Sequence, residues 1–338
     1  MNILAVESSC DETAVAVVRD GREVLADCIA SQVALHREYG GVVPEIASRK
    51  HIEAIYALAD EALERAGVQR SDVDAVAVTY APGLIGAVLV GVNFAKAAAL
   101  ALDVPIIPVH HLKGHIAANY LAYPELEPPF LCLVVSGGHT MIVNVKSYTD
   151  LEIMGSTRDD AAGECFDKVG RVLGMPYPGG AALDRTAKLG DDTKYPMPQP
   201  KLSGNPLDMS FSGLKTATLN MIHNFRQREE EIDIPSLCAS FTKAVSDMLL
   251  PRTMAALKQC GYDKLAIAGG VAANSRIRAD FEAAAKAVGA QLYVPPLSLC
   301  GDNGAMIGSQ AYYEYLAGNL GDQSLNAYAT KSILGEQM

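Results

Sequence analysis

The sequence lacks several features that would place it in familiar classes of protein. No C-x-x-C pair occurs among its seven cysteines, which are spread from Cys10 to Cys300. A dispersed, odd count does not suit the disulfide framework of a small secreted domain, and it predicts reduced thiols. No basic and then apolar leader stands at the start of the sequence, so we expect no export signal and a cytoplasmic protein.

Long apolar runs are missing as well. The most apolar stretch, residues 81–102, is interrupted by glycines, Asn93 and Lys96. It therefore falls short of the roughly 18 uninterrupted apolar residues that suggest a membrane span. We interpret this stretch as a buried core helix.

Positive charge is scarce. The chain has 28 lysines and arginines against 39 aspartates and glutamates, which gives a net charge of −11. This balance argues against a protein that binds nucleic acid unaided, because the phosphate backbone is itself polyanionic. A polyanionic partner would need a local basic patch or the help of another subunit.

The residues that are present indicate a soluble α/β protein with a repeated pattern. With 338 residues, the chain is long enough for two domains. One order of elements occurs twice, as strand, polar turn, strand, hairpin and strand. The strands of the two copies are expected at residues 2–7, 14–19 and 22–31, and at 130–135, 141–146 and 150–155.

This repeat predicts two α/β domains, residues 1–128 and 129–338, around a central cleft. A mostly helical insertion over about residues 158–246 would act as a lid or wall. After Asn319 the sequence is polar and loosely patterned, and we expect a partly disordered tail.

Two histidines four residues apart form the first candidate site. His111 and His115 follow a short apolar strand and stand at the start of a predicted helix. Residues at this spacing share one helix face, so both imidazoles can reach a single metal ion. A pair of surface or capping histidines is the alternative. A zinc protease would place Glu directly after the first histidine, but Leu112 stands there.

Asp302 is the candidate third ligand. It lies between Gly301 and Asn303 at the head of the last long helix, where an N-cap is the ordinary role. Two histidines and one carboxylate suit ferrous iron or zinc. The expected geometry has matching elements of the two half-domains facing each other across the cleft.

Glycine turns and an acidic turn are the other candidate sites. Ser136-Gly137-Gly138 and Gly269-Gly270 each follow a predicted strand, in what we take to be matching places of the two half-domains. Backbone N–H groups of such turns can hold phosphate oxygens. The turn with Asp11 and Glu12 is either a solvated hairpin loop or a carrier of carboxylates to a site.

Five motifs together resemble one known family along almost the whole chain. They are HHLKGH at 110–115, VSGGHT at 135–140, SFSGLKT at 210–216, GGVAANS at 269–275 and DNGAM at 302–306. The sequence is similar to the TsaD family (also called Gcp or YgjD), the tRNA threonylcarbamoyl-adenosine synthase subunit. The resemblance implies a duplicated actin/Hsp70/sugar-kinase (ASKHA) fold and a nucleotide cleft.

The resemblance also implies a reaction and a set of site residues. The family transfers the threonylcarbamoyl group from threonylcarbamoyl-AMP to the N6 amine of the adenosine 3′ of the anticodon, in tRNAs that read ANN codons. By resemblance, one Fe(2+), or zinc in its place, would be held by His111, His115 and Asp302. Asp11 and Glu12 would help to deprotonate the attacking amine. The substrate-binding residues implied for the adenylate are Val134, Val135, Ser136, Gly137, Gly138, Asp167, Gly180, Asp184 and Asn274.

The implied partners are tRNA, a paralogous TsaB-like subunit and a TsaE-like P-loop ATPase, with ATP or an adenylate in the cleft and no membrane. For tRNA we expect a basic patch of Arg49, Lys50 and the basic residues between Lys194 and Lys215. The rival interpretations are a metalloprotease, a sugar or acetate kinase of the same fold, and a nucleotide-dependent chaperone module.

Overall fold

The computed structural model describes residues 1–200 and 202–334, and the chain forms two compact units. Unit 1 contains Met1–Pro128, Lys146–Leu151 and the residues from Pro295 onward. Unit 2 contains Pro129–Val145 and Glu152–Val294. The expected boundary near residue 128 agrees with this grouping. The expected C-terminal domain 129–338 does not, because the last helices belong to unit 1.

Unit 1 is built on a five-stranded sheet of order β3-β2-β1-β4-β5, in which β1 pairs antiparallel with β2 and parallel with β4. Its elements are β1 (Asn2–Glu7), β2 (Glu12–Arg19), β3 (Glu23–Ser31), α1 (Val33–Tyr39), α2 (Pro44–Ala66), β4 (Ala75–Ala81), α3 (Ile85–Leu102), β5 (Ile106–His110), α4 (His111–Ala122), α10 (Leu297–Cys300) and α11 (Gly304–Leu316). Helix α1 was not expected from the sequence.

Unit 2 repeats this topology in a second sheet of order β10-β9-β6-β7-β8. Strand β6 pairs antiparallel with β7 and parallel with β9, as β1 pairs with β2 and β4. The elements are β6 (Phe130–Val135), β7 (Thr140–Val145), β8 (Leu151–Ser156), α5 (Ala162–Val172), α6 (Gly179–Ala187), α7 (Ser212–Gln227), α8 (Ile234–Cys260), β9 (Lys264–Ala268), α9 (Ser275–Ala287) and β10 (Gln291–Tyr293). The expected duplication and the helical insertion are therefore present.

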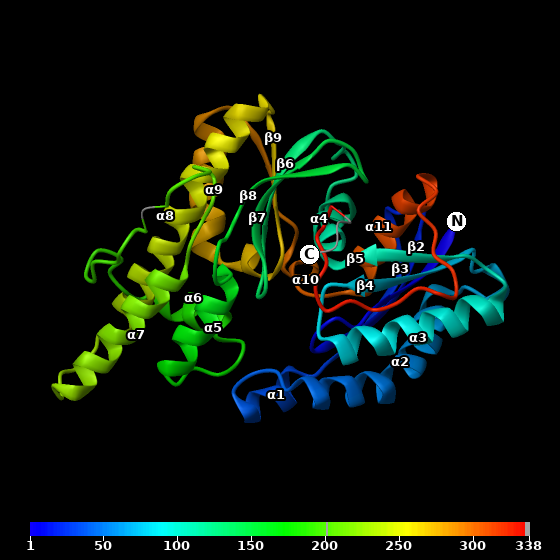
Figure 1. Ribbon diagram of the computed structural model, residues 1–338, viewed down its shortest axis with the longest axis horizontal. Helices are drawn as coiled ribbons and strands as arrows, with labels where there is room; N and C mark the ends of the chain where they lie inside the picture. Colours follow the sequence, from blue (N-terminus) through cyan, green and yellow to red (C-terminus); the bar gives the residue numbers. More distant parts are fainter. Residues whose placement is uncertain (201, 335–338) are drawn as a thin grey trace. The chain divides into compact units, whose positions relative to one another are not determined.

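Strand β1 is buried on both faces, which explains its continuous apolar sequence. Leu4 and Val6 point to a core shared with α2 and α3, while Ile3 and Ala5 point to a second core shared with α4 and α11. The sheet of unit 1 thus lies between two pairs of helices, α2 and α3 on one face and α4 and α11 on the other (Figure 1).

Small residues set how closely α11 approaches this sheet. A side chain at Gly304 would place its Cβ 2.7 Å from the backbone nitrogen of Ala16 on β2. A side chain at Gly114 of α4 would come within 2.7 Å of Ile307 on α11. Gly304 is needed because the start of α11 and the backbone of β2 lie almost in contact, whereas Gly114 meets the end of the Ile307 side chain. The head of α11 is thereby held beside α4.

Helix α3 is the one helix among the described residues that is long and apolar enough to cross a membrane by length and composition. Its buried side, which includes Val88 and Val92, packs against the core that α2 and the sheet share. This agrees with the expected core helix, although Ile85, Leu89 and Leu100 are exposed on its other side.

The segment after α11 is ordered as far as residue 334. Tyr328 donates its backbone N–H to Tyr80 at 2.9 Å, and Gly83 donates to Ala329 at 3.1 Å. The expected disordered tail is therefore wrong for residues 320–334, and the remainder of that expectation lies outside the described residues.

Candidate metal centre and nucleotide site

The metal candidate lies entirely within unit 1. His111 and His115 occupy the first turns of α4, and His110 caps that helix. The expectation that Asp302 would come from the other half-domain is wrong. The close packing of α4 and α11 brings it to the histidines inside one unit.

Asp302 is free to face the histidines because its neighbour performs the capping role. The N-cap of α11 is Asn303, whose side-chain oxygen accepts from Met306 N at 2.8 Å. The carboxylate of Asp302 lies 3.5 Å from His111 Nε2 and 3.3 Å from His115 Nε2, in both cases measured to Oδ1. The alternative role of Asp302 as an N-cap is therefore excluded.

These distances fit a bound cation. A tetrahedral ion with bonds of about 2.0–2.1 Å separates its ligand atoms by roughly 3.3–3.4 Å. Within the described part of the chain, one group of three or more possible ligands lies within 4.8 Å of one another, and it is His111, His115 and Asp302. Two imidazoles and one carboxylate leave positions open for a substrate oxygen.

Glu7, which the sequence did not identify, orients one of the rings. Its side chain is fully buried at the end of β1. Oε2 lies 2.9 Å from His111 Nδ1 and accepts from Thr79 Oγ1 at 2.6 Å, while Ser9 N donates to Oε1 at 2.5 Å. A carboxylate on the far ring nitrogen is a common support for a metal-binding histidine. His115 has no such support, because its buried Nδ1 finds no partner among the described residues.

The protonation of the site follows from these contacts. Burial opposes a charge on His111, but the carboxylates of Glu7 and Asp302 outweigh it and raise the pKa of His111 to about 9. Burial also opposes the ionisation of Asp302, yet the two histidines hold the pKa of its carboxyl below the usual value. A metal ion would therefore displace a proton from His111 on binding.

The acidic turn after β1 belongs to the same neighbourhood. Asp11 is buried, so the alternative of a solvated hairpin loop does not hold. Burial and the charges of Asp11 and Asp302 raise the pKa of Glu12, whose Oε1 accepts from Ser31 Oγ at 3.0 Å. Several carboxylates thus gather beside only two imidazoles, and a divalent cation would offset their repulsion.

The nucleotide candidates lie in unit 2. Val134 and Val135 end the buried strand β6, and the turn Ser136-Gly137-Gly138 follows, with Ser136 buried and both glycines exposed. The second glycine turn belongs to the same unit and not to the other half-domain as expected. Gly269 has φ +94°, and a Cβ there would lie 2.5 Å from the carbonyl oxygen of Val135. The two turns therefore meet at the ends of the neighbouring parallel strands β6 and β9.

The other polar candidates each bind the start of a helix. Asp167 accepts from Gly180 N at the start of α6 at 3.2 Å. Asp184 accepts from Ser275 N at 3.1 Å and from Ser275 Oγ at 2.8 Å. Asn274 caps α9 by accepting from the backbone N–H groups of Arg276 and Ile277. These contacts gather α5, α6 and α9 around one region of unit 2.

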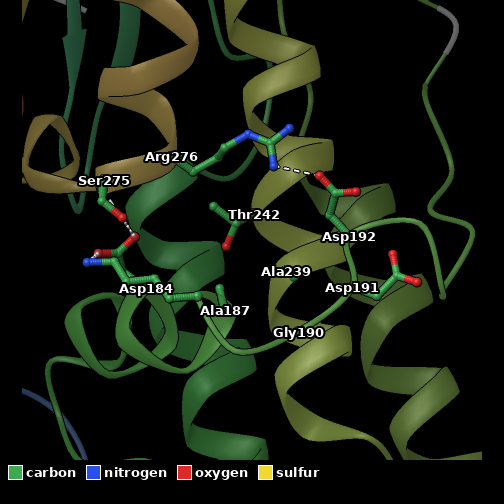
Figure 2. Close-up of a pocket in the computed structure, with 10 residues that line it drawn as sticks. Asp184, Ala187, Gly190, Asp191, Asp192, Ala239, Thr242, Ser275 and Arg276 are labelled. Carbon is green, nitrogen blue, oxygen red and sulfur yellow. Dashed lines mark hydrogen bonds and ion pairs between the residues drawn. The ribbon is translucent and has the colours of Figure 1, made fainter.

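Beyond Asp184 this region opens into a cavity of about 410 Å³ (Figure 2). Arg276, Thr242 and Asp192 line it, and sequence reasoning did not identify them. The signal for Arg276 was its place two residues after Asn274, at the end of the motif that follows the glycine turn. Thr242 lies in the middle of a long helix and gave no signal.

The described members of the expected basic patch are each paired with an acid. Arg49 lies 2.7 Å from Glu45, and Lys50 lies 2.5 Å from Glu53. Lys194 pairs with Asp233, and Lys215 pairs closely with Asp160. Lys201 lies outside the described residues. Their charge is thus largely balanced locally, which weakens the expected patch.

Comparison with known proteins identifies what this chain resembles. A family model described as TsaD, tRNA N6-adenosine threonylcarbamoyltransferase, matches residues 23–309. The protein of that name from Clostridium perfringens is 53% identical over 325 residues, which cover 96% of each chain. The one from Clostridium botulinum is 51% identical over 327 residues, 97% of this chain and 96% of its own.

Two solved structures share the fold at low identity. HypF from T. kodakarensis matches with a TM-score of 0.62 and 15% identity, over 96% of this chain and 49% of HypF. Component A of the Acidaminococcus fermentans (R)-2-hydroxyglutaryl-CoA dehydratase matches with a TM-score of 0.54 and 14% identity, over 94% and 98%. With the two matching sheets, these likenesses show a duplicated actin-like ATPase fold.

Proposed function

The chain belongs to the TsaD family of tRNA N6-adenosine threonylcarbamoyltransferases, and from that premise we propose its donor, its metal and its mechanism. It is a transferase that modifies tRNA. The proposed donor is threonylcarbamoyl-AMP, and the acceptor is the N6 amine of the adenosine 3′ of the anticodon in tRNAs that read ANN codons. The proposed ion is Fe(2+), one per subunit, with zinc as the alternative.

The convergence of His111, His115 and Asp302 is the observation that carries this proposal. The distances from Asp302 Oδ1 to both rings are those of neighbouring ligands on one ion. A bound cation would supply Lewis acidity and neutralise charge that develops on the phosphate of the leaving group. Glu7 holds His111 with Nε2 toward Asp302.

The transfer itself replaces one bond by another. The amine nitrogen of the target adenosine attacks the carbamoyl carbon, the bond from that carbon to the phosphate oxygen breaks, and AMP leaves. Asp11 or Glu12 accepts the amine proton in our proposal, since both are carboxylates beside the metal ligands. A nearby cation would lower the raised pKa of Glu12 and leave its carboxylate ionised, so that it could accept the proton.

Unit 2 supplies the groups that we propose for the adenylate. Backbone N–H groups of Gly137 and Gly138 would donate to the phosphate, an effect of about 3–4 kcal/mol for a well-placed donor. Asp167, Asp184 and Asn274 would border the ribose and the base, beside the helix starts that they bind. The mixed anhydride must be kept from water, and we assign that role to the helices between residues 158 and 246.

Partners remain part of the proposal. A net charge of −11 and locally paired basic residues favour helper proteins for the grip on tRNA. We propose the paralogous TsaB-like subunit and the TsaE-like P-loop ATPase implied by resemblance. An apolar cavity of about 320 Å³ between α2 and α3, with Tyr56 and Phe94 among its lining, offers one protein partner an apolar surface. The tRNA substrate and the seven cysteine thiols favour the cytoplasm.

No observation favours the rival functions. A zinc protease of the helical histidine-pair type places its general base, a Glu, directly after the first histidine, but Leu112 follows His111. A sugar or acetate kinase of this fold leaves the three converging ligands without a role. A nucleotide-dependent chaperone module does so as well.

Reconstitution tests the proposal. Purified protein is incubated with tRNA, threonylcarbamoyl-AMP, ATP and the partner proteins, and the modified nucleoside is measured by mass spectrometry. We expect His111→Ala to lose bound metal and at least 100-fold in product formation. His223→Ala, on the exposed face of α7, is the matched control and should keep both. Equal modification by wild type and His111→Ala would remove the metal from the mechanism.

A further inference from the structure

The acidic turn after β1 is bound at both ends by one side chain of α2. His51 is fully buried, and its two ring nitrogens reach opposite ends of the turn. Nε2 lies 2.9 Å from the carbonyl oxygen of Cys10, and Nδ1 lies 2.7 Å from the hydroxyl oxygen of Thr13. The two residues that we propose as proton acceptors, Asp11 and Glu12, lie between these contacts in the chain.

The partners of His51 determine which ring nitrogen carries a hydrogen. The carbonyl oxygen of Cys10 can only accept, so Nε2 of the ring donates to it. Burial lowers the pKa of His51 below its usual value and outweighs the opposing bond to Cys10 and the nearby carboxylates. The ring is therefore neutral at pH 7, and its Nδ1 accepts from the Thr13 hydroxyl. Because both nitrogens are bonded, the ring has one orientation and joins the two ends of the turn.

The middle of the same turn is bound by the end of β3. Gln32 N donates to the carbonyl oxygen of Asp11 at 2.9 Å, and Ser31 Oγ donates to Glu12 Oε1 at 3.0 Å. The turn is thus tied at its middle to β3 and at both ends to α2. Asp11 is only 5% exposed as a result, so its carboxyl group lies where these contacts place it.

The equivalent turn of unit 2 is closed in another way. Ser136 N donates to His139 O at 2.8 Å, and His139 N donates to Ser136 Oγ at 3.2 Å, so this turn bonds to itself. Its bond from α5 uses a backbone group, Gly163 N, which donates to Ser136 O at 3.2 Å. The shared topology can therefore form such a turn without a buried imidazole. Burying an imidazole costs free energy, and unit 1 does so at the turn that carries the two carboxyl groups.

We infer that His51 is a positioning residue for the transfer reaction, which holds the carboxyl groups of Asp11 and Glu12 where one of them can accept the proton of the attacking amine. The inference rests on the proposed function for the role of these carboxyl groups. A general base must lie within hydrogen-bond reach of the proton that it accepts, so a small displacement of the turn slows the chemical step. Binding of the adenylate, which we assign to unit 2, does not depend on this turn.

Steady-state kinetics of the reconstituted enzyme test this inference. Thr13→Val keeps the shape of a buried side chain and removes the hydroxyl that His51 binds. We expect kcat to fall about tenfold, while KM for threonylcarbamoyl-AMP and the amount of bound metal stay within about twofold of wild type. Thr13→Ser keeps the hydroxyl and should restore kcat to within about threefold of wild type. This separation of kcat from KM, with rescue by serine, distinguishes positioning from a merely structural role.

Thr253→Val is the matched control. Thr253 is a fully buried threonine of α8, and its hydroxyl donates to Leu249 O at 2.9 Å. The substitution also removes one buried hydrogen bond, but it should leave kcat unchanged. An equal loss of kcat in Thr13→Val and Thr253→Val would overturn the inference, and so would a wild-type kcat in Thr13→Val.

A second variant keeps the test decisive if Thr13→Val is poorly folded. His51→Gln retains a side-chain N–H group for Cys10 O but has no acceptor at the place of Nδ1, so it should lower kcat as Thr13→Val does. In the double variant the two losses should not add, because both substitutions remove the same bond. Fully additive losses would mean that the two residues act independently, against the inference.

The proposed function can fail separately. Crystal structures of wild type and Thr13→Val locate the turn whether or not the enzyme forms product. If wild type forms no threonylcarbamoyl-adenosine but the turn moves by about 1 Å in Thr13→Val, His51 positions the carboxyl groups for another reaction. If the modified nucleoside forms and Thr13→Val changes neither the turn nor kcat, only the positioning role is lost.

Discussion

The two units carry different polar groups at the same point of their shared topology, where the first strand of each sheet ends. In unit 1 the last residue of β1, Glu7, and Asp11 in the turn after it are buried acidic side chains. In unit 2 the turn after β6 is Ser136-Gly137-Gly138, which offers backbone N–H groups and almost no side chain. Strands β1 and β6 hold equivalent positions in their sheets. In the proposed function, the duplicated fold would hold a cation with side chains in one copy and an anion with its backbone in the other.

Glu7→Gln is the substitution that should change unit 1 most selectively. The amide keeps the size of the side chain but loses the charge that holds His111, so we expect metal affinity to fall about 10–100-fold. Competition with a chromophoric chelator, using Co(2+) or Zn(2+), measures the effect. Glu53→Gln, on the exposed face of α2, is the control. Unchanged affinity in Glu7→Gln would mean that ring orientation does not depend on this carboxylate.

Gly137→Ala tests whether the turn after β6 in unit 2 binds a phosphate. A Cβ at Gly137 meets no atom within 4 Å, so the fold should tolerate it. If the turn holds the phosphate, the added methyl group occupies the space of the ligand, and AMP affinity should fall about tenfold with little change in Tm. Gly213→Ala on α7 also meets no atom within 4 Å and is the matched control. Equal effects of the two substitutions would contradict a phosphate site at this turn.

Asp27→Asn tests how much a buried carboxyl group lowers the stability of unit 1. Burial raises the pKa of Asp27 to about 6, although backbone donors of Gly304 and Ala305 oppose the shift. Because the pKa in the folded state exceeds that of the unfolded chain, the ionised group lowers stability above pH 6. That cost disappears as the pH falls below about 4. We expect Asp27→Asn to raise the free energy of unfolding by roughly 1–2 kcal/mol at pH 8 and to leave it almost unchanged at pH 4.

Thermal unfolding at the two pH values checks this smaller effect, which should appear as a few degrees in Tm. Asp247→Asn, on the exposed face of α8, is the control and should change Tm little. A gain of the same size at pH 4 and pH 8 would mean that the titration of Asp27 is not its source.

Local patterns were enough to predict much of the fold. Strands β1 and β6 begin and end at the expected residues, because each is a continuous apolar run bounded by polar or glycine turns. The histidine pair was visible because four-residue spacing fixes its geometry on any helix. The repeat of strand, turn and strand predicted the duplicated sheets for the same reason.

Features that depend on distant contacts were not predictable. The contact of Glu7 with His111 spans 104 positions and arises where β1 and β4 end beside α4. The unit that contains Asp302 is decided by the fit of α11 on β2, through Gly304 and Ala16. The Thr242 hydroxyl has no hydrogen-bond partner in the described part of the chain, and no sequence pattern indicates this.

Because Asp302 belongs to unit 1, that unit is completed only by the end of the chain. On the ribosome, His111 and His115 emerge before the whole of unit 2, and at about 5–20 residues per second Asp302 follows on the order of 10–40 s later. The nascent chain therefore passes through a period in which His111 and His115 lack the carboxylate of Asp302. Stalled translation products that end before residue 302 should bind the ion weakly, whereas those that expose the whole of α11 should retain it.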